Sequence, residues 1–270
     1  MKLFSKVLGE GQDLIILHGL YGAGDNWLTV ARQLSDNFKV HLIDQRNHGS
    51  SAHAKDHSYL ALAGDLKEYI EDNNIKSPIL LGHSMGGKTV MWFSIFNPEV
   101  ASKLIIVDIS PVNYSQISTP SSLIEQHLNI VNAMRLVDLT VCKTRNDIDG
   151  ELAAYIRSDK IRQFLLKSID REKDGAFKWK LNVNAISNYL PEIMKGIDIE
   201  KYASQINPQI PVLFIRGELS DYVPDEDLDK INKLYPQVEI ETILGSGHWI
   251  HAEKPEAFIL VVKRFLGLIE

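Results

Sequence analysis

The most constraining stretch of this chain is a serine flanked by glycines, in residues 82–86, which stands between two segments of opposite character. The apolar run 78–81 before it is typical of a buried strand, and residues 88–96 after it are typical of a helix. A strand that passes into a helix over so few residues needs a very tight turn. We therefore expect Ser84 to adopt a strained backbone conformation, with glycines at 82 and 86 because a Cβ atom there would clash.

A Gly-x-Ser-x-Gly turn in this setting is typical of a nucleophile elbow, which exposes a serine hydroxyl at the edge of a parallel sheet. A serine hydroxyl is a weak nucleophile at neutral pH, so chemistry at Ser84 requires a neighbouring base and a third group that orients this base. The alternative is a chance match in a loop rich in glycine and serine. The character of both flanking segments disfavours it.

Strand-like and helical segments alternate up to residue 110 and again after residue 208. The expected strands are residues 3–8, 13–17, 38–43, 78–81, 104–108, 211–215 and 238–244. The expected core helices are residues 25–36, 59–73, 88–96, 225–234 and 255–266. Continuous apolar runs such as 13–17 are typical of parallel strands that are covered on both faces. The pattern predicts an α/β fold with a mostly parallel central sheet and helices on both faces.

Residues 111–207 break this alternation. Their periodicity is helical from Ser121 to Ser168 and again over 186–194, with one short alternating segment at 177–183. A helical segment between two strand signals predicts a mainly helical cap, 111–207, inserted into a core of 1–110 and 208–270. The cap carries no recognisable motif, so the sequence does not identify the substrate.

Composition and charge exclude several classes of protein. The chain has 270 residues, of which 44% are hydrophobic and 24% charged, so it can bury a large core and disorder is not expected. Its net charge of −6 offers no basic surface for nucleic acid or an anionic membrane. Cys142, the single cysteine, excludes an intrachain disulfide and a cysteine-based metal cage. With no signal peptide and no apolar run long enough to span a membrane, we expect a cytoplasmic protein without metal.

His248 is the best candidate base among the nine histidines, because it lies in a glycine-rich loop after the last expected strand. Two residues compete as the acid that would orient it. Asp108 ends its strand, whereas Asp221 lies one residue beyond the usual acid position, which Ser220 occupies. A shift of one residue redirects a side chain, so we favour Asp108 and keep Asp221 as the alternative.

An acyl-transfer site also needs two N–H donors for the developing oxyanion. Met85, the residue after the nucleophile, is expected to supply one main-chain donor, and Leu20, in the loop after strand 13–17, the other. His18, His48 and His83 are candidates for the rim of the same pocket, although each has a simpler interpretation as a turn residue or as a supporting donor.

The motifs together resemble those of the α/β-hydrolase superfamily, and within it the YbfF group of small bacterial esterases. The matching segments are His18-Gly19, residues 44–51, 82–88, 108–114 and 247–255. The resemblance implies a serine esterase or thioesterase that acts on a small acyl ester or thioester without a cofactor. It also implies that Asp108, with a hydroxyl at the position of Ser220, serves His248. Asp221 beside Ser220 is a departure that adds a second carboxylate.

Two other functions compete with this interpretation. Gly22-Ala23-Gly24 opens a helix after a strand, as in dinucleotide-binding proteins, but Trp27 occupies the position of the third glycine. The second alternative is a slow, hydrolase-like protein that binds a ligand under the cap, and its sequence would carry the same triad.

Overall fold

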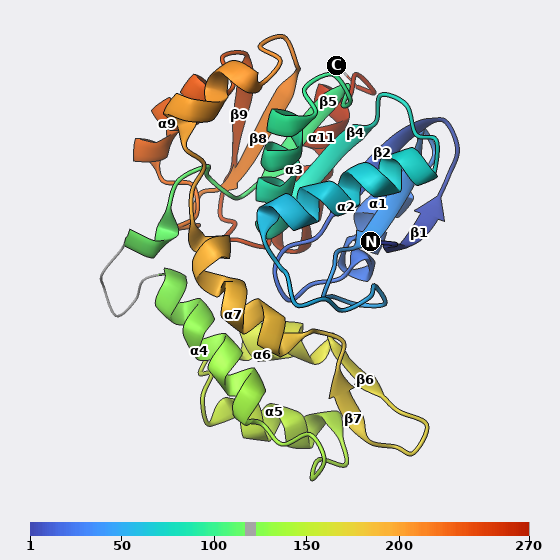
Figure 1. Ribbon diagram of the computed structural model, residues 1–270, viewed down its shortest axis with the longest axis vertical. Helices are drawn as coiled ribbons and strands as arrows, with labels where there is room; N and C mark the ends of the chain where they lie inside the picture. Colours follow the sequence, from blue (N-terminus) through green and yellow to red (C-terminus); the bar gives the residue numbers. More distant parts are fainter. Residues whose placement is uncertain (117–122, 270) are drawn as a thin grey trace.

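The computed structural model describes residues 1–116 and 123–269, and its core is one seven-stranded sheet (Figure 1). The strand order is β1-β3-β2-β4-β5-β8-β9, with β1 antiparallel to β3 and all other neighbours parallel. The strands are β1 (Phe4–Leu8), β2 (Gln12–Leu17), β3 (Phe38–Asp44), β4 (Ile79–His83), β5 (Lys103–Val107), β8 (Val212–Gly217) and β9 (Val238–Ile243). The expected strands are confirmed, and the first lies at the sheet edge.

Helices cover both faces of this sheet because successive side chains of its buried strands point to opposite sides. In β2, Ile15 and Leu17 pack in a cluster with α2 and α3, whereas Leu14 and Ile16 pack in a second cluster with α1 and α11. All four side chains are buried, which explains why the strand has no polar alternation. The core helices are η1 (Gly24–Trp27), α1 (Leu28–Leu34), α2 (Tyr59–Asp72), α3 (Met85–Phe96), η4 (Asp225–Asp227), α9 (Leu228–Leu234), α10 (Ile250–Glu253) and α11 (Pro255–Phe265).

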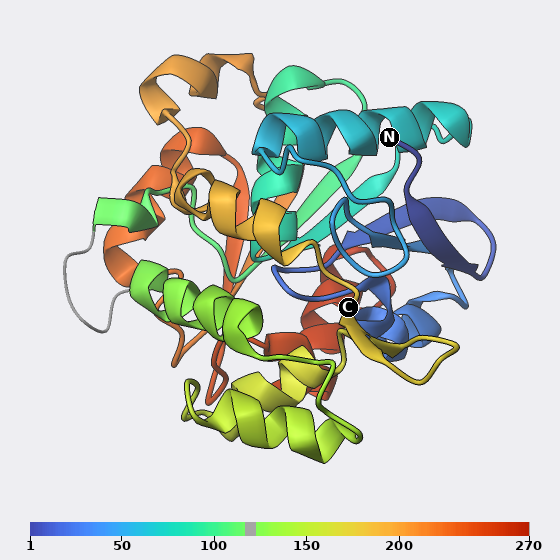
Figure 2. The same ribbon diagram turned by 60° about the horizontal axis from the view of Figure 1, so that its bottom comes forward.

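A mainly helical segment follows β5. It contains η2 (Tyr114–Gln116), α4 (Leu123–Leu136), α5 (Arg145–Ala153), α6 (Asp159–Leu166), the hairpin β6 (Ile169–Arg171) and β7 (Phe177–Trp179), α7 (Val183–Met194), α8 (Ile199–Tyr202) and η3 (Ala203–Gln205). This confirms the expected helical cap, although Ser121, where its helical pattern was expected to begin, lies outside the described residues. The elements from α4 to α7 gather beyond one end of the sheet, at the bottom of Figure 1, whereas the last elements of the segment, α8 and η3, pack on α9 and α3 of the core. In Figure 2 the bottom of the molecule is turned toward the viewer, and α4 to α6 lie in front of the core. The boundaries after 110 and 207 stay predictions.

The strand register brings the candidate residues to one edge of the sheet. His83 pairs with Val107, and Val107 pairs with Ile215. Ser84 and Asp108 therefore follow directly at the carboxyl ends of adjacent parallel strands. Loops from the same edge carry the residues that follow β2 and β9, so segments far apart in the sequence meet there.

Candidate active site

Ser84 occupies the turn between β4 and α3 with a backbone conformation that few residues other than glycine adopt. Its φ is 53° and its ψ is −120°. Its N–H donates to the Val107 carbonyl at 2.9 Å, which ties the turn to the end of β5. A residue other than glycine with such backbone dihedral angles lowers the stability of the fold by about 1–3 kcal/mol, so it occurs only where the surrounding structure holds it in place. The strain expected from the sequence is confirmed.

The glycines around Ser84 are required by close backbone contacts. A Cβ atom on Gly82 would lie 2.3 Å from the Gly86 carbonyl oxygen, and one on Gly86 would lie 2.3 Å from that of Leu17. A Cβ atom on Gly19 would lie 3.1 Å from the Ser84 Cβ. The expectation for 82 and 86 is confirmed, and Gly19 has a similar role from the loop after β2.

Asp108 is hydrogen-bonded to His248. The distance from His248 Nδ1 to Asp108 Oδ2 is 2.7 Å, and the Asp108 side chain is completely buried. The Gly217 N–H donates to its other oxygen at 2.9 Å, and the Ser220 hydroxyl donates to Oδ2. Because Nδ1 donates to a carboxylate, the neutral imidazole presents Nε2 as an acceptor.

Asp221 does not take part in these contacts. It is exposed at the pocket wall, and the described residues include no hydrogen bond between it and His248. Of the two carboxylates that the sequence left in competition, Asp108 is therefore the one in contact with the imidazole. Ser220, at the usual acid position, binds Asp108 instead.

His83 connects the serine turn to the loop of His248. Its Nε2–H donates to the His248 carbonyl at 2.8 Å, and the centroids of the His83 and His248 rings lie 4.7 Å apart. Burial lowers the pKa of His83 well below its ordinary value, and the neighbouring His248 and His251 lower it further. A neutral His83 with its proton on Nε2 accounts for this contact. The residue therefore stabilises the position of the loop that carries His248.

The two proposed oxyanion donors flank Ser84. Met85 begins α3, and the first N–H groups of a helix have no partner within it. Leu20 lies in the loop after β2, and Leu20, Ser84 and Met85 line one small cleft together. This loop is held by imidazoles: His18 Nε2 accepts from the Gln45 N–H at 3.0 Å, and His48 Nε2 accepts from the Tyr21 N–H at 3.2 Å.

Burial lowers the pKa of both His18 and His48, so they are neutral and keep one nitrogen as an acceptor. Their Nδ1–H groups face the carbonyls of Gly19 and Arg46. The interpretation of these two histidines as supporting residues is confirmed by these contacts, although His18 also reaches the pocket wall.

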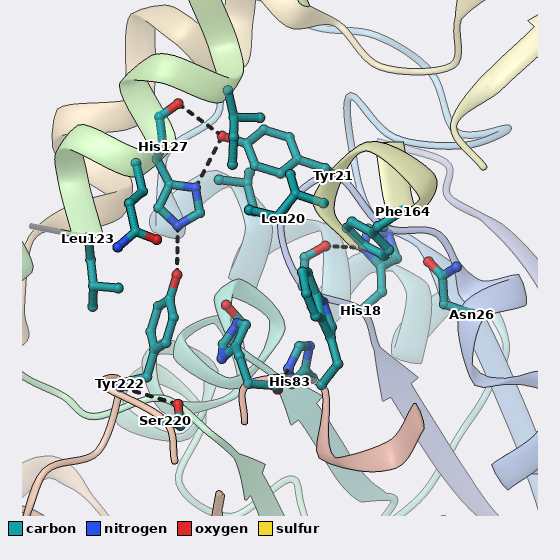
Figure 3. Close-up of a pocket in the computed structure, with 18 of the residues that line it drawn as sticks. His18, Leu20, Tyr21, Asn26, His83, Leu123, His127, Phe164, Ser220 and Tyr222 are labelled. Atoms are coloured by element: carbon teal, nitrogen blue, oxygen red, sulfur yellow. Dashed lines mark hydrogen bonds between the residues drawn. The ribbon is translucent and has the colours of Figure 1, made fainter. Parts of the chain in front are cut away.

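Ser84 and His248 line the same pocket of about 250 Å³, shown in Figure 3. Its core side comes from the loops after β2, β4, β8 and β9, and its other side from α4 and α6 of the cap. The cap side contributes four apolar residues, Leu123, Ile130, Ile161 and Phe164, together with the polar Gln126, His127 and Ser158.

A cap histidine that is not among the candidates from the sequence also lines this pocket. His127 of α4 is hydrogen-bonded through Nε2 to the Tyr222 hydroxyl at 2.8 Å and through Nδ1 to the Tyr21 hydroxyl at 3.2 Å (Figure 3). Burial lowers the pKa of His127 to about 3, and His248 contributes to this shift. His127 follows no expected strand of the sheet, so no local signal in the sequence marks it as a residue of the site.

The structure disfavours the dinucleotide alternative, which needs a free acidic side chain about 20 residues after the glycines to bind a ribose hydroxyl. Asp44 stands at that position. The Asp44 carboxylate accepts from the N–H groups of Gly24 and Ser50, each at 2.7 Å, so it is engaged within its own loop. Trp27 is buried and stacks on His251 with 4.0 Å between ring centroids.

Among the residues that the structure describes, no group of three or more His, Cys, Asp or Glu could hold a metal ion. No helix in this part of the chain is long and apolar enough to cross a membrane.

Comparisons with known proteins agree with this architecture. The sequence model of the α/β hydrolase fold matches residues 14–136. The chain is 32% identical to the esterase YbfF of Escherichia coli over 254 residues, which is 94% of this chain and 92% of that protein. It is 34% identical to the sn-1-specific diacylglycerol lipase ABHD11 of Mus musculus over 258 residues, with 94% and 80% covered. A solved structure titled a marine microorganism esterase is 44% identical, with a TM-score of 0.91, and 98% of this chain and 99% of that one are covered.

Proposed function

The chain belongs to the α/β-hydrolase family and is similar to the YbfF esterases, and on this premise we propose that it hydrolyses carboxylic esters with Ser84 as nucleophile. The observation that carries the proposal is the hydrogen bond between Asp108 and His248 on the wall of the pocket that Ser84 also lines. Relatives named as an esterase and as a lipase support the reaction class.

In the proposed mechanism His248 Nε2 takes the proton of the Ser84 hydroxyl as the oxygen attacks the ester carbonyl. Asp108 keeps the imidazole proton on Nδ1 and stabilises the imidazolium that forms. The complete burial of Asp108, together with its bonds from Gly217 and Ser220, supports this assignment because a carboxylate held on both oxygens cannot rotate away.

The negative oxygen of the tetrahedral intermediate would bind the N–H groups of Leu20 and Met85. As the intermediate collapses, the bond to the leaving alcohol or thiol breaks and His248 returns the proton to that group. The acyl group stays on Ser84 until a water molecule, deprotonated by His248, attacks its carbonyl. The bond to the Ser84 oxygen then breaks, His248 returns the proton to that oxygen, and the acyl group leaves as a carboxylic acid. We propose a substrate with an apolar acyl group, because Leu123, Ile130, Ile161 and Phe164 give the cap wall of the pocket an apolar part, and we include oxygen esters and thioesters.

The test is hydrolysis of p-nitrophenyl esters of increasing acyl length, together with acyl thioesters, by wild type and Ser84→Ala. We expect the wild type to turn over and Ser84→Ala to lose activity by several orders of magnitude. Equal activity in the two proteins would end the proposal. Tight binding of the esters by the wild type without turnover would instead support the alternative of a ligand-binding protein.

A further inference from the structure

One carboxylate, that of Glu253, accepts both main-chain N–H groups that flank His248. The Gly247 N–H donates to Glu253 Oε2 at 2.8 Å, and the Trp249 N–H donates to Oε1 at 3.2 Å. Glu253 is the last residue of α10, which follows the His248 loop directly. The carboxylate therefore bridges the residues before and after His248 and ties this loop to the end of α10.

The cap reaches the same carboxylate. Lys160 of α6 donates to Glu253 Oε1 at 2.5 Å, and its ammonium lies 4.9 Å from the centroid of the Trp249 ring. Phe164, one turn further along α6, lies 5.2 Å from the same ring. Glu253 thus stands where the loop of His248 meets the cap.

Glu253 is ionised in this position. Its side chain is 21% exposed. Burial alone would raise its pKa, but the hydrogen bond from Lys160 and those from the two amides lower the pKa below its ordinary value. An ionised carboxylate is the stronger acceptor for the two N–H groups, so the contact is suited to hold the loop rigidly.

From these contacts we propose that Glu253 is a positioning residue, which holds the peptide groups on both sides of His248 so that its imidazole points at Ser84. This inference rests on the proposed function. Asp108 holds the ring at Nδ1 and His83 holds the carbonyl of His248, but neither contacts the adjoining amides. Without the carboxylate both amides lose their acceptor, and a small displacement of a general base can slow a reaction by about 10²-fold.

The test compares Glu253→Ala and Glu253→Gln with Glu218→Ala. Glu218 is a matched control because its carboxylate accepts the N–H of Gly245, at 2.8 Å, in the same loop but away from His248. We expect Glu253→Ala to lower kcat about 10- to 100-fold with KM changed less than about threefold. Glu253→Gln keeps one carbonyl acceptor, so its kcat should lie between those of Glu253→Ala and the wild type. Glu218→Ala should retain kcat within about twofold of the wild type. Circular dichroism confirms that each variant is folded.

A second measurement is independent of turnover. The histidine N–H bonded to Asp108 should give a low-field proton NMR signal, assigned by its loss in Asp108→Asn, which shifts or broadens in both Glu253 variants but not in Glu218→Ala. If Glu253→Ala does not fold, Glu253→Gln carries both measurements. An unchanged kcat and signal in the folded Glu253 variants, or an equal loss in Glu218→Ala, overturns the inference. Absence of Ser84-dependent turnover in wild type refutes the proposed function alone, and the NMR signal still decides the role of Glu253.

Discussion

The Tyr222 ring stacks on the His248 imidazole, with 3.8 Å between ring centroids and 18° between their planes. The hydroxyl of the same tyrosine is hydrogen-bonded to His127 of the cap. The cap and the candidate base are therefore joined through one side chain, which also belongs to the loop that carries Ser220.

Tyr222→Phe separates the two contacts of this tyrosine, because it removes the hydroxyl and keeps the ring. His127 would lose a hydrogen bond in a buried site, so we expect the free energy of unfolding to fall by about 1–3 kcal/mol. We expect kcat to change little, since the stacked ring remains. Urea denaturation and ester hydrolysis measure both, with the exposed Tyr155 as the matched Tyr→Phe control. Equal stability of the two variants would contradict this expectation.

Asp108→Asn should lower kcat by about 10³- to 10⁴-fold, because an amide that donates to Nδ1 stabilises the wrong imidazole tautomer. Asp221→Asn should stay within about twofold of the wild type, since Asp221 is exposed and not bonded to His248. Both variants preserve side-chain volume, so kcat measured on one ester compares them directly. A larger loss in Asp221→Asn would reverse the assignment of the acid.

Lys88 should make stability depend on pH. It is buried on α3, and its Nζ donates to the carbonyls of Val112 at 3.0 Å and Lys195 at 2.6 Å, in the segments before α4 and after α7. Burial lowers its pKa from 10.5 to about 7, against a smaller opposing effect of Asp227. Between these two values the unfolded chain binds a proton that the folded chain lacks, so this group makes stability rise with pH; below about 7 both states are protonated and its contribution is constant.

Lys88→Met should abolish this rise in stability between pH 7 and pH 10.5. It should also destabilise the fold, because two buried carbonyls lose their donor. Urea denaturation of wild type, Lys88→Met and the exposed control Lys55→Met at pH 7 and pH 9.5 checks both statements. A wild type and a Lys88→Met variant with the same dependence on pH would refute the assignment to this lysine.

Gly86→Ala should unfold or inactivate the protein, because the added Cβ would lie 2.3 Å from the Leu17 carbonyl oxygen and 2.7 Å from that of His18. Gly150 is the matched control. It lies within α5, and no described atom lies within 4 Å of the position that an added methyl group would take. Gly150→Ala should therefore raise stability by about 0.5–1 kcal/mol through helix propensity. Thermal unfolding followed by circular dichroism distinguishes the two, and a stable, active Gly86→Ala variant would disprove the packing argument.

Much of the fold could be predicted because its signals are local. The apolar run in β2, the serine between glycines and the helical period of the cap all reflect interactions between residues close in the chain. The positions of Asp108 and His248 at strand ends were also readable, because parallel strands bring their carboxyl ends to one edge. The arrangement of the site was less accessible. No local signal places His127 and Tyr222 at the pocket wall, or the Glu253 carboxylate at the amides on both sides of His248.

The sequence by itself determined the α/β alternation, the helical cap and the tight turn at Ser84, since the hydrophobic periodicity and the close approach of Gly82 to Gly86 involve residues near one another in the chain. Only the tertiary structure decided that Asp108, and not Asp221, contacts His248, and that His127 reaches Tyr222 across 95 positions. A hydrogen bond forms or fails within a few tenths of an ångström, and that distance depends on how whole elements pack.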